Sequence, residues 1–137
     1  MLEYDIKKIG RFVIKKPKEG FEFKVKRDVK LLNFLKDITP PTCYDSKRNI
    51  LIQKYIEGRH PTDDELEQIS KEIEKRGVIP RGITKSDVII DKSGKFYILD
   101  VGNFEIDKKA LPKYQETKIP SCDSWDLRCK SIKFLEE

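Results

Sequence analysis

Cysteine, histidine and long hydrophobic runs are scarce in this 137-residue chain. The three cysteines, Cys43, Cys122 and Cys129, form no C-x-x-C pair, and the single histidine, His60, is not near them in sequence. An odd number of cysteines without metal-ligand spacing argues against a disulfide framework and a zinc site, so reduced thiols in a cytoplasm are expected. No apolar run reaches the length that spans a bilayer, and the first residues do not have the pattern of a signal peptide.

Charge, by contrast, is abundant: 39% of the residues are charged and 37% are hydrophobic, which suits one solvated domain with a thin core. Residues 1–60 hold 15 basic and 8 acidic residues, a net charge of +7, whereas residues 61–137 hold 14 and 16, a net charge of −2. Two interpretations stay open. The basic half either binds an anionic partner or uses its lysines for solvation, and we favour solvation because these residues are scattered.

Hydrophobic periodicity and turn residues predict an α+β fold. The helix that begins near Thr62 is the best marked, because Thr62 and Glu65 have the spacing of a capping box and Gly77 is a stop signal. In chain order the predicted elements are strands at 4–9 and 11–16, a helix at 22–36, a strand at 49–56, a helix at 62–76, a hairpin of strands 87–90 and 95–99, an irregular polar stretch at 103–120, and a helix at 123–136.

Two aspartates bracket the predicted hairpin. Asp87 opens it and Asp100 follows it, and paired strands bring these two ends together. Two neighbouring carboxylates repel each other and are relieved by a bound cation, for which oxygen ligands favour Mg²⁺. Taken alone, two ordinary aspartates at strand ends are the simpler interpretation.

Several segments, in their order along the chain, resemble the sequence signatures of protein kinases. Residues 77–91 resemble the kinase catalytic loop and the strand after it, and Asp100-Val101-Gly102 resembles the metal-binding D-F-G. The other similar segments are Val13-Ile14-Lys15 for the end of V-A-I-K, residues 27–32 for the helix that carries the acidic partner of that lysine, residues 51–58 for the strand and hinge between the lobes, and residues 123–127 for the helix after the activation segment.

The resemblance implies a truncated protein-kinase-like fold. Residues 1–56 would form an N-lobe-like subdomain, a small antiparallel sheet with one helix. Residues 57–137 would follow the hinge as a reduced, helical C-lobe with a catalytic-loop hairpin, and the two would make one compact domain. Asp87 and Asp100 would hold Mg²⁺. The residues that the resemblance places at the nucleotide are Lys15, Asp28 in place of the usual glutamate, Gln53, Tyr55 and Ile56.

The departures from the family pattern indicate an inactive member. Gly82 occupies the position of the catalytic-loop aspartate and cannot accept a proton from a substrate hydroxyl, so no catalytic residue is assigned. Pro80 stands where histidine is usual, only Gly10 is available for a glycine-rich loop, and no A-P-E follows Gly102. We therefore predict a pseudokinase that binds ATP and Mg²⁺ weakly or not at all, and neither zinc nor haem.

Such a module would act as a cytoplasmic, regulatory domain that binds a protein partner or a second copy through the truncated C-lobe face, away from membranes. One alternative is a minimal atypical Ser/Thr-type protein kinase that uses MgATP. A third is a nucleic-acid-binding module built on the basic N-terminal half with Phe12, Phe21 and Phe23, although these phenylalanines are expected in the core.

Single residues also carry expectations. Lys15 is either the phosphate contact or an ordinary solvated lysine, with Lys16 taking its place if the strand register shifts by one residue. Arg81 is expected in a structural ion pair and His60 on the surface. Trp125 and the cysteines are expected to be buried.

Overall fold

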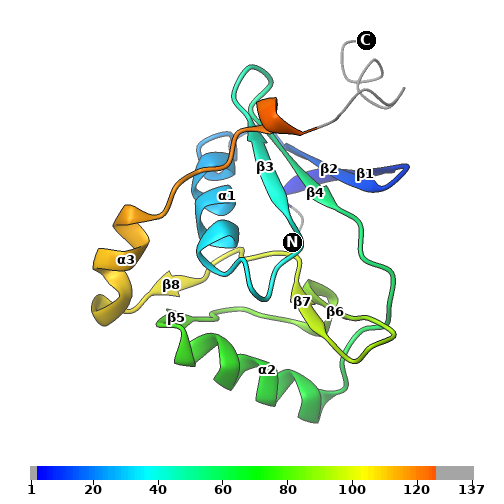
Figure 1. Ribbon diagram of the computed structural model, residues 1–137, viewed down its shortest axis with the longest axis vertical. Helices are drawn as coiled ribbons and strands as arrows, with labels where there is room; N and C mark the ends of the chain where they lie inside the picture. The colour runs from blue at the N-terminus through cyan, green and yellow to red at the C-terminus, as the bar shows by residue number, and fades with distance from the viewer. Residues whose placement is uncertain (1–2, 126–137) are drawn as a thin grey trace.

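Residues 3–125 form a mixed α+β structure with antiparallel sheets in the computed structural model (Figure 1), and the coarse fold class predicted from the sequence is confirmed. None of the helices among these residues has the length and apolar character that crossing a membrane requires. The strands are β1 (Tyr4–Ile9), β2 (Phe12–Pro17), β3 (Thr42–Asp45), β4 (Ile50–Lys54), β5 (Val78–Ile79), β6 (Val88–Ile90), β7 (Phe96–Ile98) and β8 (Glu105–Ile106), and the helices are α1 (Lys24–Phe34), α2 (Asp63–Lys75) and α3 (Leu111–Glu116).

The largest sheet has the strand order β1-β2-β4-β3, with every neighbouring pair antiparallel. Because side chains alternate between the two faces of a strand, residues of β2 and β4 divide between them. On one face, Leu51 of β4 and Tyr4 of β1 pack against Val25 and Val29 of α1. Lys15 is paired with Leu51, so its side chain points to this same α1 face.

A second buried cluster joins α1 to the elements that follow the sheet. In Figure 1, α2 lies along the lower edge of the molecule, with β6 and β7 between it and the sheet. The predicted boundary between two subdomains at residue 56 stays a prediction. The cluster contains residues from both sides of this position: Leu31, Leu32, Leu35, Ile38, Ile69, Ile73, Val78, Val88, Ile90, Ile98, Val101 and Phe104.

Helix α2 begins and ends where its sequence signals predict. The Thr62 hydroxyl accepts a hydrogen bond from the Glu65 backbone N–H (3.2 Å), and the Glu65 carboxylate accepts one from the Thr62 N–H (2.9 Å), so the capping box is complete. After the helix, Gly77 has a φ of +81°, and a Cβ there would lie 2.3 Å from the Cβ of Ala110. Only glycine meets both requirements.

The structure corrects the prediction in several places. The stretch 103–120 is not irregular throughout, because β8 pairs with β5 and α3 places Tyr114 edge-on against Phe34 of α1. Strand β3, directly after Pro41, was not predicted. Phe23 is 76% exposed and does not belong to the core. Where a helix is predicted at 123–136, the structure has a 3₁₀ turn at Cys122–Ser124. Residues 126–136 of this prediction lie outside the described residues.

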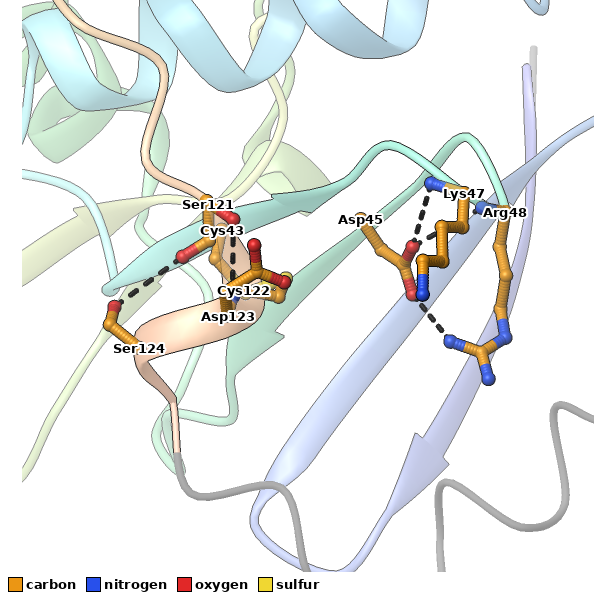
Figure 2. The surroundings of a disulfide bond; sticks show 8 residues. All are labelled: Cys43, Asp45, Lys47, Arg48, Ser121, Cys122, Asp123 and Ser124. Atoms are coloured by element: carbon orange, nitrogen blue, oxygen red, sulfur yellow. Dashed lines mark hydrogen bonds and ion pairs between the residues drawn. A yellow bond between two sulfur atoms is a disulfide. The ribbon is translucent and has the colours of Figure 1, made fainter.

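The expectation of unpaired thiols is also wrong, because Cys43 and Cys122 form a disulfide with a Cα–Cα distance of 5.0 Å. Figure 2 shows Cys122 on the short turn that faces Cys43 of β3. The chain after α3 reaches this position alongside β3, where the Tyr44 N–H donates to the Pro120 carbonyl at 2.7 Å. The disulfide thus fastens the turn at Cys122–Ser124 over the sheet face opposite α1, where Trp125 packs beside Phe12 with ring centres 5.8 Å apart.

Candidate functional site

Lys15 lies near the three aspartates that the sequence analysis singled out, Asp28, Asp87 and Asp100. Its side chain is buried on the α1 face of the sheet, and its ammonium donates a hydrogen bond to the Leu99 carbonyl at 2.6 Å. Burial lowers the pKa of Lys15, while the carboxylates of Asp100, Asp28 and Asp87 act in the opposite direction. All three carboxylates therefore lie close enough to act on this charge. Neighbouring Lys16 is exposed, so the register places Lys15 inward.

Asp28 of α1 faces this cluster but is bonded to other groups. Its carboxylate accepts a hydrogen bond from the Tyr4 hydroxyl (2.5 Å) and one from the Arg27 guanidinium (2.9 Å). Burial raises the pKa of Asp28, and the bond from Tyr4 and the charge of Arg27 counteract that rise. Burial and the charge of Asp28 raise the pKa of Tyr4. Among residues 3–125, Asp28 and Lys15 form no ion pair, and Tyr4 holds the aspartate instead.

Asp87 and Asp100 lie at the two ends of the hairpin, which the Leu99 N–H closes by donating to the Asp87 carbonyl at 2.8 Å. One Asp87 oxygen accepts the N–H (2.8 Å) and the hydroxyl (3.1 Å) of Thr84, and one Asp100 oxygen accepts the Gly102 N–H (2.8 Å). Burial is the larger cause of the raised pKa of Asp87, and the charge of Asp100 adds to it. The second oxygen of each carboxylate has no hydrogen-bond partner among the described residues.

These two carboxylates fit what Mg²⁺ needs from a protein, which is one or two carboxylates supplemented by water and substrate phosphates. A complete protein cage is absent from the part of the chain that the structure describes, since no group of three or more histidine, cysteine, aspartate or glutamate side chains gathers there. A Mg²⁺ ion held by Asp87 and Asp100 would complete its coordination with water or with phosphate oxygens of a nucleotide.

The other predicted nucleotide contacts have local partners. The buried Gln53 amide donates to the Thr42 hydroxyl at 3.1 Å. The Tyr55 N–H donates to the Arg11 carbonyl at 2.8 Å. Its exposed ring lies under the Lys8 ammonium, with 4.0 Å between the ammonium nitrogen and the ring centre. Ile56 is half-buried and lines a cavity formed by α1, β4 and β7.

At the catalytic-loop position, Gly82 is exposed with a φ of +71°, and the nearest group to a Cβ placed there is the Asn103 amide, 3.9 Å away. Glycine suits this left-handed backbone, and it offers no carboxylate to a substrate. The preceding Arg81 pairs with Glu105 at 2.9 Å, in agreement with the expected structural ion pair. His60 is exposed, and one ring nitrogen contacts the Val88 carbonyl.

Sequence reasoning missed two residues, Lys24 and Arg27, that fasten α1 to the segment after Asp100. Lys24 pairs with Glu3 at 2.6 Å and donates to the Gly102 carbonyl at 3.2 Å. Arg27 donates to the same carbonyl at 3.0 Å and also to the Phe104 carbonyl. The available signal was the spacing of Lys24, Asp28 and Leu31, which puts charged residues beside the apolar stripe of α1.

Compared with known proteins, the chain matches no family model and no curated protein. Its functional interpretation therefore rests on the geometry of Lys15, Asp28, Asp87 and Asp100.

Proposed function

We propose that this chain is a kinase-like module of the pseudokinase type, which does not transfer phosphate efficiently and acts as a regulatory, protein-binding domain. The observation that carries the proposal is the position of Lys15. It is buried among three aspartates that the kinase resemblance selects, yet its ammonium is bonded to the Leu99 carbonyl. The cluster supports the relationship, and the way it is bonded supports inactivity.

Two parts of phosphoryl transfer are altered together. Tyr4 and Arg27 hold Asp28, so this aspartate does not position Lys15 for a phosphate. Gly82 supplies no proton acceptor, and loss of a general base costs on the order of 10²–10⁴ in rate. Phosphoryl transfer depends mainly on positioning and electrostatics. The loss of a positioned lysine therefore lowers the rate of transfer further than the missing base does alone.

A minimal kinase that uses MgATP is the second candidate, favoured by one observation. The raised pKa of Asp87 reflects burial and the nearby Asp100, and a divalent cation would relieve that repulsion. When bound, Mg²⁺ would neutralise charge on the nucleotide phosphates. In this arrangement Asp87 and Asp100 would hold the ion and Lys15 would contact the phosphates.

Thermal unfolding with and without MgATP separates the two candidates, because a ligand that binds the native state raises its stability. A pseudokinase that does not bind nucleotide shows no shift at millimolar MgATP and transfers no labelled phosphate to a general acceptor protein. An active kinase shows a Mg²⁺-dependent shift of several degrees that disappears in Asp100→Asn and Lys15→Ala. Asp5→Asn, at an exposed position on β1, is the matched control and should leave any shift intact.

A shift of several degrees together with phosphate transfer would contradict the pseudokinase proposal. The protein-binding role makes a separate prediction, namely a complex with a partner or a second copy that forms as concentration rises. Binding that instead favours nucleic acid and weakens steeply with salt would support the third candidate.

A further inference from the structure

A groove lies at the end of the sheet where β3 begins and β4 ends. Its larger cavity, of about 530 Å³, is bounded by the end of α1, the start of β3, the end of β4 and β7. A second cavity of about 310 Å³ shares Pro41, Lys54 and Trp125 with the first and continues to Arg11 and Phe12. The two cavities thus make one continuous groove along Pro41, Lys54 and Trp125.

The groove is positively charged. Lys36, Lys54 and Lys95 line the larger cavity and Arg11 lines the smaller one, and no carboxylate is among the described residues that line either. The side chains of Lys36 and Lys54 form no hydrogen bond or ion pair with any of residues 3–125. The charge of Lys95 lowers the pKa of the nearby Asp37, but the Asp37 carboxylate is paired with Arg76 at 2.8 Å. These cations are therefore not neutralised within the groove.

The other polar side chains of the groove are already bonded. The Thr39 hydroxyl donates to the Leu32 carbonyl, the Thr42 hydroxyl donates to the Pro40 carbonyl, and the Asn33 amide donates to the Lys118 carbonyl. The lysines and Arg11 are thus the groups available to a ligand. Between them the lining is apolar, supplied by Leu32, Pro40, Pro41, Ile56, Phe12 and Trp125.

We propose that this groove binds an acidic peptide segment of a protein partner, with carboxylates at the lysines and an apolar side chain between Pro41 and Trp125. Charge complementarity selects an anionic occupant. Nucleic acid binds by stacking its bases on free aromatic rings. The aromatic rings of this groove already have neighbours, which disfavours nucleic acid as the occupant. Trp125 and Phe12 pack on each other, and Lys95 lies 4.9 Å from the centre of the Tyr97 ring.

The inference deepens the protein-binding part of the proposed function by naming the chemistry of the partner. It concerns a different surface from the Lys15 cluster, because the lining of the groove contains neither Lys15 nor the three aspartates. The MgATP experiment reports on Lys15, and a peptide titration reports on the groove, so either can fail while the other holds.

Trp125 is the only tryptophan of the chain and lines both cavities, so its fluorescence reports directly on the groove. The full oxidised chain is titrated with a short tryptophan-free peptide of glutamate and leucine. We expect saturable binding in the micromolar range, which is typical of weak complexes. The same peptide with glutamine in place of glutamate should bind at least tenfold more weakly.

Charge reversal locates the contact. Lys36→Glu with Lys54→Glu should weaken peptide binding about tenfold or more. Lys26→Glu with Lys108→Glu changes the net charge equally at exposed positions outside the groove and should leave the affinity within twofold. A peptide with lysine in place of glutamate should bind the groove variant more tightly than it binds the original chain, which also shows that the variant is folded.

Three results would overturn the proposal. The first is no response of Trp125 to millimolar acidic peptide. The second is an equal loss of affinity in the two double variants, because that would mean attraction to net charge alone. The third is a single-stranded oligonucleotide that binds the groove more tightly than the peptide at the same salt concentration.

Discussion

Asp28 is buried to 2% exposure, and its carboxylate accepts hydrogen bonds from Tyr4 of β1 and Arg27 of α1. An aspartate in this setting resists ionisation more than it does in the unfolded chain, since burial is the dominant cause of its raised pKa. The residue thus couples folding to pH. The direction of the coupling follows from which state releases its proton first.

The unfolded chain releases the Asp28 proton near its ordinary pKa of 3.8, below the pKa in the folded protein. The contribution of Asp28 to stability is therefore fully present below the unfolded-state pKa of 3.8, and it is lost as pH rises through the folded-state pKa. Asp28→Asn keeps an oxygen for the Tyr4 hydroxyl and does not titrate. We expect the variant to gain stability relative to the original chain between about pH 4 and pH 7, as measured by urea unfolding across that range.

Asp5→Asn is the control for this prediction, because it removes an exposed aspartate from β1. Its difference from the original chain should vary less with pH than that of Asp28→Asn. A difference between Asp28→Asn and the original chain that stays constant from pH 4 to pH 7 would show that Asp28 has the same pKa in both states.

At the scale of single elements, α2 is the helix with the most complete local signals. Its capping box satisfies backbone groups at its first turn, and Asp63 and Asp64 there suit the helix dipole. Thr62→Ala removes the hydroxyl that accepts the Glu65 N–H and should lower the free energy of unfolding by about 1 kcal/mol. Ser46→Ala, in the exposed turn between β3 and β4, should change it by less than about 0.5 kcal/mol. Equal effects would mean that the cap does not stabilise α2.

The elements predicted from sequence are those whose signals are local. The β1–β2 hairpin, α1, β4, α2 and the β6–β7 hairpin each have a periodic apolar pattern bounded by turn or cap residues. Strand β3 has four residues and depends on pairing with β4, and α3 has six residues with an exposed surface. Elements this short are determined by tertiary contacts, which a periodicity argument does not include.

The site divides in the same way. The sequence predicts that Lys15, Asp87 and Asp100 lie close together, on the basis of a strand, a hairpin and the resemblance to protein kinases. The bonds of Lys24 and Arg27 to the Gly102 carbonyl join residues more than seventy positions apart and have no local pattern. The same holds for the disulfide, whose cysteines are 79 positions apart.

At the scale of the whole molecule, that disulfide joins the sheet to the end of the described chain. It closes a long loop and restricts the unfolded state, which is typically worth about 2–4 kcal/mol. Reduction should therefore lower the free energy of unfolding by about that amount, as measured by urea unfolding with and without a thiol reductant. Because residues 117–125 also carry Trp125, its fluorescence should change on reduction.

The experiment is made in a Cys129→Ser background, which removes the third thiol from exchange. Cys43→Ala with Cys122→Ala in that background should have the reduced stability and should not respond to reductant. A stability that does not change when the original chain is reduced would show that the bond contributes nothing.

Helix α1 connects the two surfaces that have been assigned roles. Near its first turn, Lys24 and Arg27 grip the backbone beside Asp100, and near its last turn, Leu32 and Asn33 line the groove. The helix has 11 residues and is therefore about 16 Å long. Because the helix is rigid over that length, a ligand in the groove that shifts α1 along its axis would also displace the contacts of Lys24 and Arg27 with the Gly102 carbonyl. The two surfaces are therefore linked through one helix.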